Sequence, residues 1–364
     1  MNRRHLFRAW AALLPFPLLQ ARGYGQQKPA GRQLQLSVQG ASSSNRLEVL
    51  KSVRGVPPDV VGAFRDPVAF AQAASGQYFV FDRLGHTVYG IDVELTGAWR
   101  LVTVGGESGR ILQPLGFSLA PSGSFAVADG PGERERIQVF GSGGALLAGF
   151  TLPGKAEVVI SIGGVPLNGA GSLHYNGRTL LLSLPETGAV VAEYSTSGAA
   201  LRTFGPLRKT GHESDRQVHL ALNSGIPLPA QDGYYLVFRA GVPAFRKFDS
   251  SGRLVFERHM EGVELDDTVN SLPTQWPRRA ASPGGTTLPL VTPVVRAAAV
   301  DGRGNLWVSF TVTPNVYVYD PSGEKIRVVR LQAAGTILPS GLFFSHTGRL
   351  LVAPGCYEFN PGTR

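Results

Sequence analysis

Cysteine is almost absent from this chain of 364 residues, which contains a single one, Cys356. One cysteine cannot form an intrachain disulfide, so the fold must be held together by burial. No second cysteine and no group of histidines stands near Cys356 in the sequence. We therefore expect its side chain to be a small buried apolar group rather than a reactive thiol or a metal ligand.

Long helical runs and long apolar runs are also missing. The apolar stretch Ala9–Leu19 is broken by Pro15 and Pro17, and it is shorter than the roughly 20 residues that a membrane-spanning helix needs. The sequence therefore predicts no transmembrane span. Glycine and proline are abundant instead, with 46 and 26 residues, which indicates many short elements joined by tight turns. An all-β sandwich, barrel or propeller of this length can be one domain.

The N-terminus has the pattern of an export signal. In residues 1–25 a basic segment precedes a short apolar one, as in secretory signals. The pair Arg3-Arg4, followed by Leu6-Phe7, resembles the twin-arginine signal of bacteria, and a plain secretory signal is the alternative. We expect residues 26–45 to be a linker and the protein to be periplasmic or secreted, in the bacterial cell envelope.

Removal of this signal changes the charge. Residues 1–25 contain four arginines and no acid, so the formal charge would fall by four from +9 to +5. Much of the positive charge then lies in the predicted export signal, and no block of five consecutive basic residues remains in the rest of the chain. We therefore expect no nucleic-acid partner.

A strand-turn-strand pattern recurs six times between residue 76 and the C-terminus. Each copy has an apolar strand after a glycine turn, a loop, a second strand that ends in Ile or an aromatic residue, and a further turn and strand. The aligned strand ends are spaced by 49, 54, 54, 71 and 40 residues and are Ile91, Phe140, Tyr194, Phe248, Tyr319 and Phe359. Four antiparallel strands with their turns need about 40–50 residues, which is the length of a propeller blade.

The prediction is an all-β fold: a six-bladed β-propeller over residues 46–364, with four antiparallel strands per blade. The sixth copy lacks its last strand, and residues 46–53 are an unassigned strand candidate. If this N-terminal strand pairs with the last copy, it closes the ring and covers two sheet edges. We expect a monomer.

The second copy is similar to a known repeat. Phe125-Ala126-Val127-Ala128-Asp129, a loop and Arg136-Ile137-Gln138-Val139-Phe140 resemble the NHL-type repeat and the related bacterial six-bladed propellers. The first copy keeps the strand-ending acid as Asp82, and the later copies have lost it. The resemblance implies a fold and not a function, because propellers host hydrolases, lyases and interaction platforms.

Residue patterns for catalysis are weak. The seven histidines form no pair with zinc-type spacing, and a Gly-x-Ser-x-Gly motif is absent. We expect no cofactor and no metal. A metal-dependent hydrolase or lyase with an axial site is the alternative function, as in propellers similar to gluconolactonases.

Two groups of residues are candidates for contact with a partner or ligand. Asp82, Arg83 and Asp129 stand at strand ends, where such acids more often bind the backbone of the following turn. The second group lies in an insertion over residues 264–295, where Trp276 stands beside Arg278 and Arg279. Long loops in compact domains are often functional, and Trp and Arg are enriched at binding hot spots.

The sequence thus predicts an exported binding module of the cell envelope, which takes an unknown protein or small ligand at one propeller face.

Overall fold

The structure is a computed structural model, and its chain separates into Met1–Ser42 and a compact unit, Ser43–Arg364. The residues that it describes are 46–132, 134–154, 172–280 and 287–362, with the backbone alone of 160–162 and 165–167. The predicted signal at residues 1–25 and linker at 26–45 lie outside the described residues.

The first four copies of the repeat form four separate antiparallel sheets of four strands each, with the strands in chain order. The first sheet contains β2 (Pro67–Gln72), β3 (Tyr78–Asp82), β4 (Thr87–Ile91) and β5 (Ala98–Val102). The second contains β6 (Pro114–Leu119), β7 (Phe125–Asp129), β8 (Arg136–Phe140) and β9 (Leu146–Thr151). The third contains β12 (Leu173–Tyr175), β13 (Thr179–Leu182), β14 (Ala189–Ser195) and β15 (Ala200–Pro206). The fourth contains β16 (Gly225–Ala230), β17 (Gly233–Phe238), β18 (Ala244–Asp249) and β19 (Leu254–His259).

The fifth and sixth copies share one eight-stranded sheet, in the order β22-β23-β24-β25-β1-β28-β27-β26. Its strands are β22 (Val295–Val300), β23 (Leu306–Phe310), β24 (Asn315–Tyr319), β25 (Lys325–Gln332), β26 (Gly341–Phe344), β27 (Leu350–Ala353), β28 (Tyr357–Phe359) and β1 (Leu47–Gly55). The N-terminal segment is thus a strand that pairs with the last copy, antiparallel to β28, and it also pairs in parallel with β25. The six separate four-stranded blades that the sequence predicts are therefore not seen: four copies form such sheets, and β1 bonds on both sides and joins the last two copies into one sheet.

The connections contain elements that the sequence did not indicate. Two of them are helices of eight residues, and the insertion predicted at 264–295 contains one of these helices and a two-stranded hairpin. The elements are α1 (Pro58–Val61), a 3-10 helix (Pro185–Thr187), α2 (Arg216–Asn223), α3 (Val263–Asn270), β10 (Ile160–Ile162), β11 (Val165–Leu167), β20 (Arg278–Ala280) and β21 (Thr287–Pro289). None of the helices in the described part of the chain is long and apolar enough to cross a membrane.

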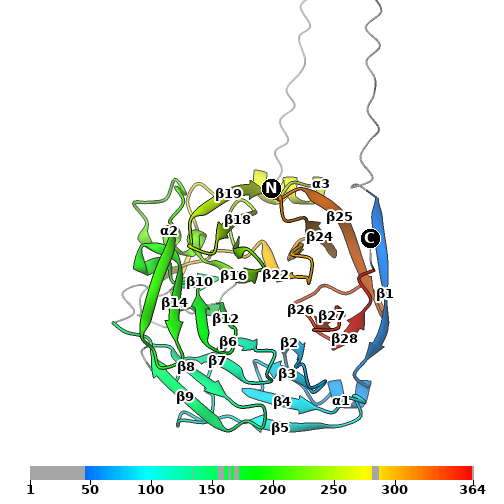
Figure 1. The fold of residues 1–364 in the computed structure, drawn as a ribbon. Coiled ribbons are helices and arrows are strands. Elements are labelled where there is room, and N and C mark those ends of the chain that lie inside the picture. The colour runs from blue at the N-terminus through cyan, green and yellow to red at the C-terminus, as the bar shows by residue number, and fades with distance from the viewer. Residues whose placement is uncertain are drawn as a thin grey trace, which may run out of the picture. The chain divides into compact units, whose positions relative to one another are not determined.

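The sheets have a propeller-like arrangement, with the first strand of each copy facing a common centre (Figure 1). These inner strands contact each other in the order β2, β6, β12, β16, β22 and β26, and β26 also contacts β2. Between the first and last copies, the Tyr78 hydroxyl on β3 donates a hydrogen bond to the Glu358 carboxylate on β28. A buried cluster that includes Phe70, Leu351 and Cys356 also spans these two copies.

The core lies between neighbouring sheets because the second strands are apolar on both faces. Every residue of β3 and β7 is buried, whereas the outer strands β5 and β9 are mostly exposed. Aromatic and β-branched residues suit such strands, because their side chains pack well on a pleated surface. Cys356 is fully buried, and burial raises the pKa of its thiol to about 12. It is therefore the buried apolar group that the sequence indicates.

Candidate functional site

The inner strands surround a cavity of about 1020 Å³. All six of these strands, β2, β6, β12, β16, β22 and β26, contribute lining residues. Ligand pockets of small molecules have volumes of roughly 300–1,000 Å³, so the cavity is large enough for one. Its wall is mostly apolar, and its partly exposed members include Phe117, Leu228 and Phe343.

One end of the cavity has the longer connections. In each sheet the first and second strands, and the third and fourth, are joined by tight turns. The other connections emerge at the opposite end because the strands are antiparallel, and among them are residues 103–113, 207–224 and 260–280. We call this end the loop face. Binding residues are commonly found on loops that a rigid scaffold positions.

Charged lining residues are concentrated at the loop-face mouth of the cavity. Arg83 follows β3, Arg239 follows β17, and Arg296 is the second residue of β22; all three line the cavity. Arg83 Nε forms an ion pair with Asp66 Oδ2 at 2.9 Å. Arg239 donates from Nε and Nη2 to Ser172 Oγ, at 2.9 and 2.6 Å. Burial, together with the positive charge of Arg83, lowers the pKa of Arg239 to about 10, so it remains charged at neutral pH.

His174, the middle residue of β12, also lines the cavity. Its side chain is partly buried between the inner strands, and burial lowers its pKa to about 4. The imidazole is therefore neutral at neutral pH, and it offers one donor and one acceptor to the cavity.

The low pKa of His174 predicts a pH dependence of stability. The unfolded chain takes up this proton near the ordinary pKa of 6.5, but the folded chain does so only near 4. The unfolded state therefore binds more protons in that window, and the free energy of unfolding falls as the pH drops through it. The loss is at most about 3 kcal/mol. Urea unfolding at several pH values should show this extra loss for the wild type relative to His174→Gln; parallel pH profiles would contradict it.

Asp82 and Asp129, predicted at strand ends, hold the backbone of the loop face. Asp82 is buried and accepts hydrogen bonds from the backbone N–H groups of Arg65, Asp66 and Gly85, at 2.9, 2.8 and 3.0 Å. Two of these bonds fix the segment that presents Asp66 to Arg83. Of the predicted residues, Arg83 alone reaches the cavity lining.

Asp129 has the same position in the second copy and is also fully buried. It accepts from the backbone of Leu112 at 2.9 Å and from Arg136, with Nε at 3.0 Å and Nη2 at 2.6 Å. Neither Asp82 nor Asp129 is a lining residue. The geometry agrees with the turn-binding interpretation that the sequence favoured.

The Trp276 group lies against α2 rather than at the cavity. Trp276 is partly buried against a cluster that includes Leu222, Ala240 and Val291. Arg278 is exposed and pairs with Asp215 at 2.5 Å, the residue that caps α2. Arg279 is exposed on β20. The sequence predicts Trp276 as a residue that contacts a partner or ligand. The amphipathic helix α2, which the sequence did not indicate, supplies this side chain with a packing surface.

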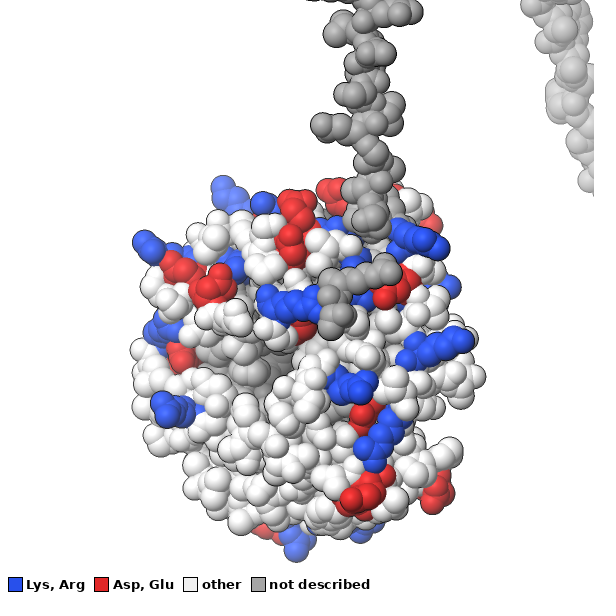
Figure 2. Space-filling model, turned by 45° about the vertical axis from the view of Figure 1, so that its right-hand side comes forward, with Lys and Arg blue, Asp and Glu red and all other residues white. Residues whose placement is uncertain are grey.

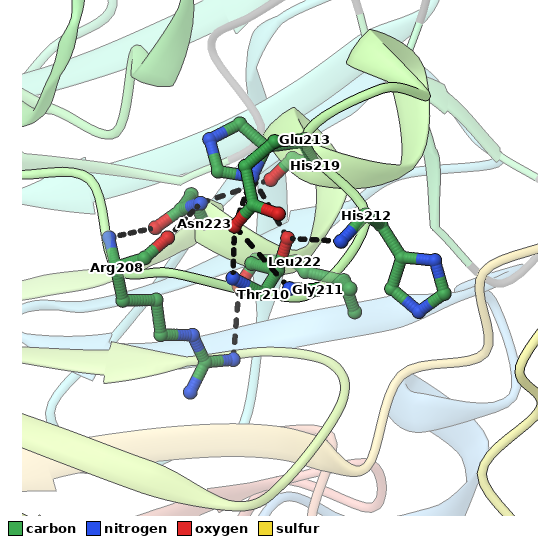
Figure 3. Close-up of polar contacts among 8 residues, drawn as sticks. All are labelled: Arg208, Thr210, Gly211, His212, Glu213, His219, Leu222 and Asn223. Carbon is green, nitrogen blue, oxygen red and sulfur yellow. Dashed lines mark hydrogen bonds and ion pairs between the residues drawn. The ribbon is translucent and has the colours of Figure 1, made fainter.

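Polar contacts fix the segment before α2 (Figure 3). Thr210 Oγ1 lies 2.8 Å from His219 Nδ1, and Asn223 Oδ1 accepts from the Arg208 backbone at 2.8 Å. The Arg208 guanidinium donates to the carbonyls of Leu222 and Ala240, at 2.9 and 3.0 Å. Arg208 therefore ties the end of α2 to the residue that follows Arg239.

Metal-ligating residues do not gather in the described part of the chain, where no group of three or more His, Cys, Asp or Glu could hold an ion. The metal-dependent alternative stays a hypothesis without a ligand set among these residues. On the face that Figure 2 draws, Lys and Arg are interspersed with Asp and Glu.

Comparison with known proteins gives similarity of fold only. No family model matches the sequence, and no curated protein matches it. Among solved structures, a gluconolactonase from Xanthomonas campestris is 17% identical, with a TM-score of 0.48, 81% of this chain covered and 86% of that one. A virginiamycin B lyase from Staphylococcus aureus is 9% identical, with a TM-score of 0.44 and coverages of 86% and 89%. A β-propeller domain from Myceliophteria thermophila is 9% identical, with a TM-score of 0.45 and coverages of 86% and 99%. These likenesses say nothing of what this chain binds, and the NHL-type resemblance stays a prediction.

Proposed function

We propose that this chain is an exported six-bladed propeller that binds a small ligand in its axial cavity, at the loop-face mouth. One observation carries the proposal: polar and charged side chains from separate copies converge at one mouth of a cavity whose wall is mostly apolar. Ligand sites typically combine an apolar lining with a few convergent polar groups in this way. We place the site of the proposed binding module at the face where Arg83 lies.

The blade number rests on the pairing of β1. The eight-stranded sheet counts as two blades of four strands if β1 is the outer strand of the last blade, antiparallel to β28. The contacts of the inner strands support a closed ring, since β26 lies against β2. The hydrogen bond between Tyr78 and Glu358 supports the same closure.

Export rests on residues 1–25 and is tested by cell fractionation. In a bacterial host with a twin-arginine system, the wild type should reach the periplasm, and the Arg3→Lys, Arg4→Lys double variant should stay in the cytoplasm. Equal amounts of both in the periplasm would support the plain secretory signal instead and contradict the twin-arginine route.

Filling the cavity should abolish ligand binding. Ala69 on β2 is partly exposed and lines the cavity, so Ala69→Trp places an indole in the ligand's space. Thermal melts are recorded with a panel of small neutral, cationic and anionic compounds. A compound at a hundred times its dissociation constant stabilises its target by about 2.7 kcal/mol, and we expect this for the wild type and not for Ala69→Trp.

The matched control is Leu147→Trp, on the exposed outer strand β9. It should respond to the same compounds as the wild type. The proposal fails if no class of compound stabilises the wild type, or if the same compound stabilises Ala69→Trp equally.

A further inference from the structure

Arg296 is an unusual residue for an inner strand. Its neighbours on β22 are Val295, Ala297, Ala298, Ala299 and Val300. Its Nε is buried and has no hydrogen-bond partner, although the side chain lines the cavity. The residue as a whole is only partly buried, but an N–H group removed from water without a partner is costly. A charge kept in such a place therefore indicates a partner that arrives from the cavity.

Among the described residues that line this mouth, arginines outnumber carboxylates. Arg83 and Arg239 come from the first and fourth copies, yet they are close enough for the charge of Arg83 to lower the pKa of Arg239, after the larger effect of burial. Asp66 is the carboxylate that lines this mouth among the described residues, and it is already paired with Arg83. The second lining carboxylate, Asp301, lies in the tight turn after β22, at the opposite end.

Asp301 is also saturated by its own turn. It accepts from the backbone of Arg303 and Asn305, both at 2.9 Å, and from the Trp307 indole at 3.1 Å. The positive charge at the loop-face mouth is therefore not balanced from the other end of the cavity.

The rest of the cavity is mostly apolar. Several apolar lining residues are only partly buried and so present surface to the space, among them Phe117, Ile226, Leu228, Leu342, Phe343 and Phe344. His174 adds a neutral imidazole, since burial lowers its pKa to about 4. A small inorganic anion would leave this apolar surface empty, whereas a ligand with an apolar body would cover it.

We propose that the cavity binds an amphipathic carboxylate, whose carboxylate pairs with the Arg296 guanidinium at the loop-face mouth and whose apolar body lies along the inner strands. Guanidinium and carboxylate match in geometry and can form two parallel hydrogen bonds. This inference rests on the proposed function, because it names the ligand class of the same cavity.

Isothermal titration calorimetry with three probes tests the role of the carboxylate and the role of the apolar body separately. Octanoate has the charge and the apolar body, octanamide has the same body without the charge, and acetate has the charge without the body. We expect octanoate to bind to the wild type, octanamide to bind at least about tenfold more weakly, and acetate not to bind. A tenfold change corresponds to about 1.4 kcal/mol, at the low end of what a hydrogen bond to a charged group contributes.

Two variants test whether Arg296 is the residue that pairs with the carboxylate. Arg296→Met keeps the apolar stem and should weaken octanoate at least about tenfold, while it leaves octanamide unchanged. Arg178→Met is the matched control, because Arg178 is exposed in the turn between β12 and β13. It should bind octanoate as the wild type does.

The outcomes distinguish this inference from the proposed function. If octanoate and octanamide bind equally and Arg296→Met changes neither, the carboxylate pairing is wrong but the cavity remains a ligand site. If only neutral or cationic compounds of the thermal panel bind, the ligand class is wrong. If nothing binds to the wild type, both statements fail.

Discussion

Deletion of residues 46–54 should lower the free energy of unfolding by at least about 4 kcal/mol, at roughly 0.5–1.5 kcal/mol for each lost hydrogen bond. The segment contains most of β1, which pairs on both sides, with β25 and β28. Within this segment, Leu50 belongs to a buried cluster with residues from the last two copies, and Glu48 forms an ion pair with Arg327 at 2.9 Å. The deletion would expose two strand edges at once, which invites aggregation as well as unfolding.

A milder variant keeps this prediction testable if the deleted chain fails to fold. Leu50→Pro removes one backbone donor and strains the middle of β1, so its urea midpoint should fall well below that of the wild type. Leu147→Pro is the matched control, since Leu147 stands at a register shift on the outer edge strand β9, where proline is tolerated. Equal midpoints for Leu50→Pro and the wild type would show that β1 is dispensable.

Asp129→Ala should lower the free energy of unfolding by about 3–5 kcal/mol, because it leaves the Arg136 charge largely buried without its carboxylate. Arg136 would keep only carbonyl partners, those of Gly106 at 2.8 Å and Arg110 at 3.0 Å. The backbone of Leu112 would also lose its acceptor. Chemical denaturation of the purified variant measures this loss.

A control and a rescue separate the charge effect from a general effect of losing a turn acid. Asp249→Ala removes an exposed pair, since the Arg253 side chain is 84% exposed, and its effect should be much smaller. Asp129→Leu combined with Arg136→Met removes both charges and should recover much of the stability, because a buried ion pair contributes little beyond an apolar pair. A double variant as unstable as Asp129→Ala would contradict this explanation.

Local sequence patterns predicted most strands, because the strands alternate with tight turns. These turns need glycine where the backbone is left-handed. Gly123, for example, has a φ of 89°, in the left-handed region, and ends the turn before β7. The inner strand β16 has no clear strand pattern in the sequence, because Pro227 and Pro229 interrupt it. An inner strand has one unpaired edge, and on such an edge a missing N–H is tolerated.

The candidate site was less predictable, because it depends on which copies face each other across the cavity. Strand-end chemistry singled out Asp82 and Arg83, and of these Arg83 lines the cavity. Arg296 could have been noticed as a charge inside the apolar run Val295–Val300, but its buried Nε depends on the closed arrangement around it. Trp276 is only partly exposed because it packs against a cluster formed largely by α2, and this helix has no strong sequence signal.

Crystals grown with 8-bromooctanoate test the ligand site most directly, because bromine can be located by its anomalous scattering. The account predicts a bromine peak inside the cavity, along the inner strands, and a carboxylate within hydrogen-bond distance of the Arg296 guanidinium. A bromine peak elsewhere on the molecule, or an empty cavity at a concentration that saturates binding in solution, would contradict it.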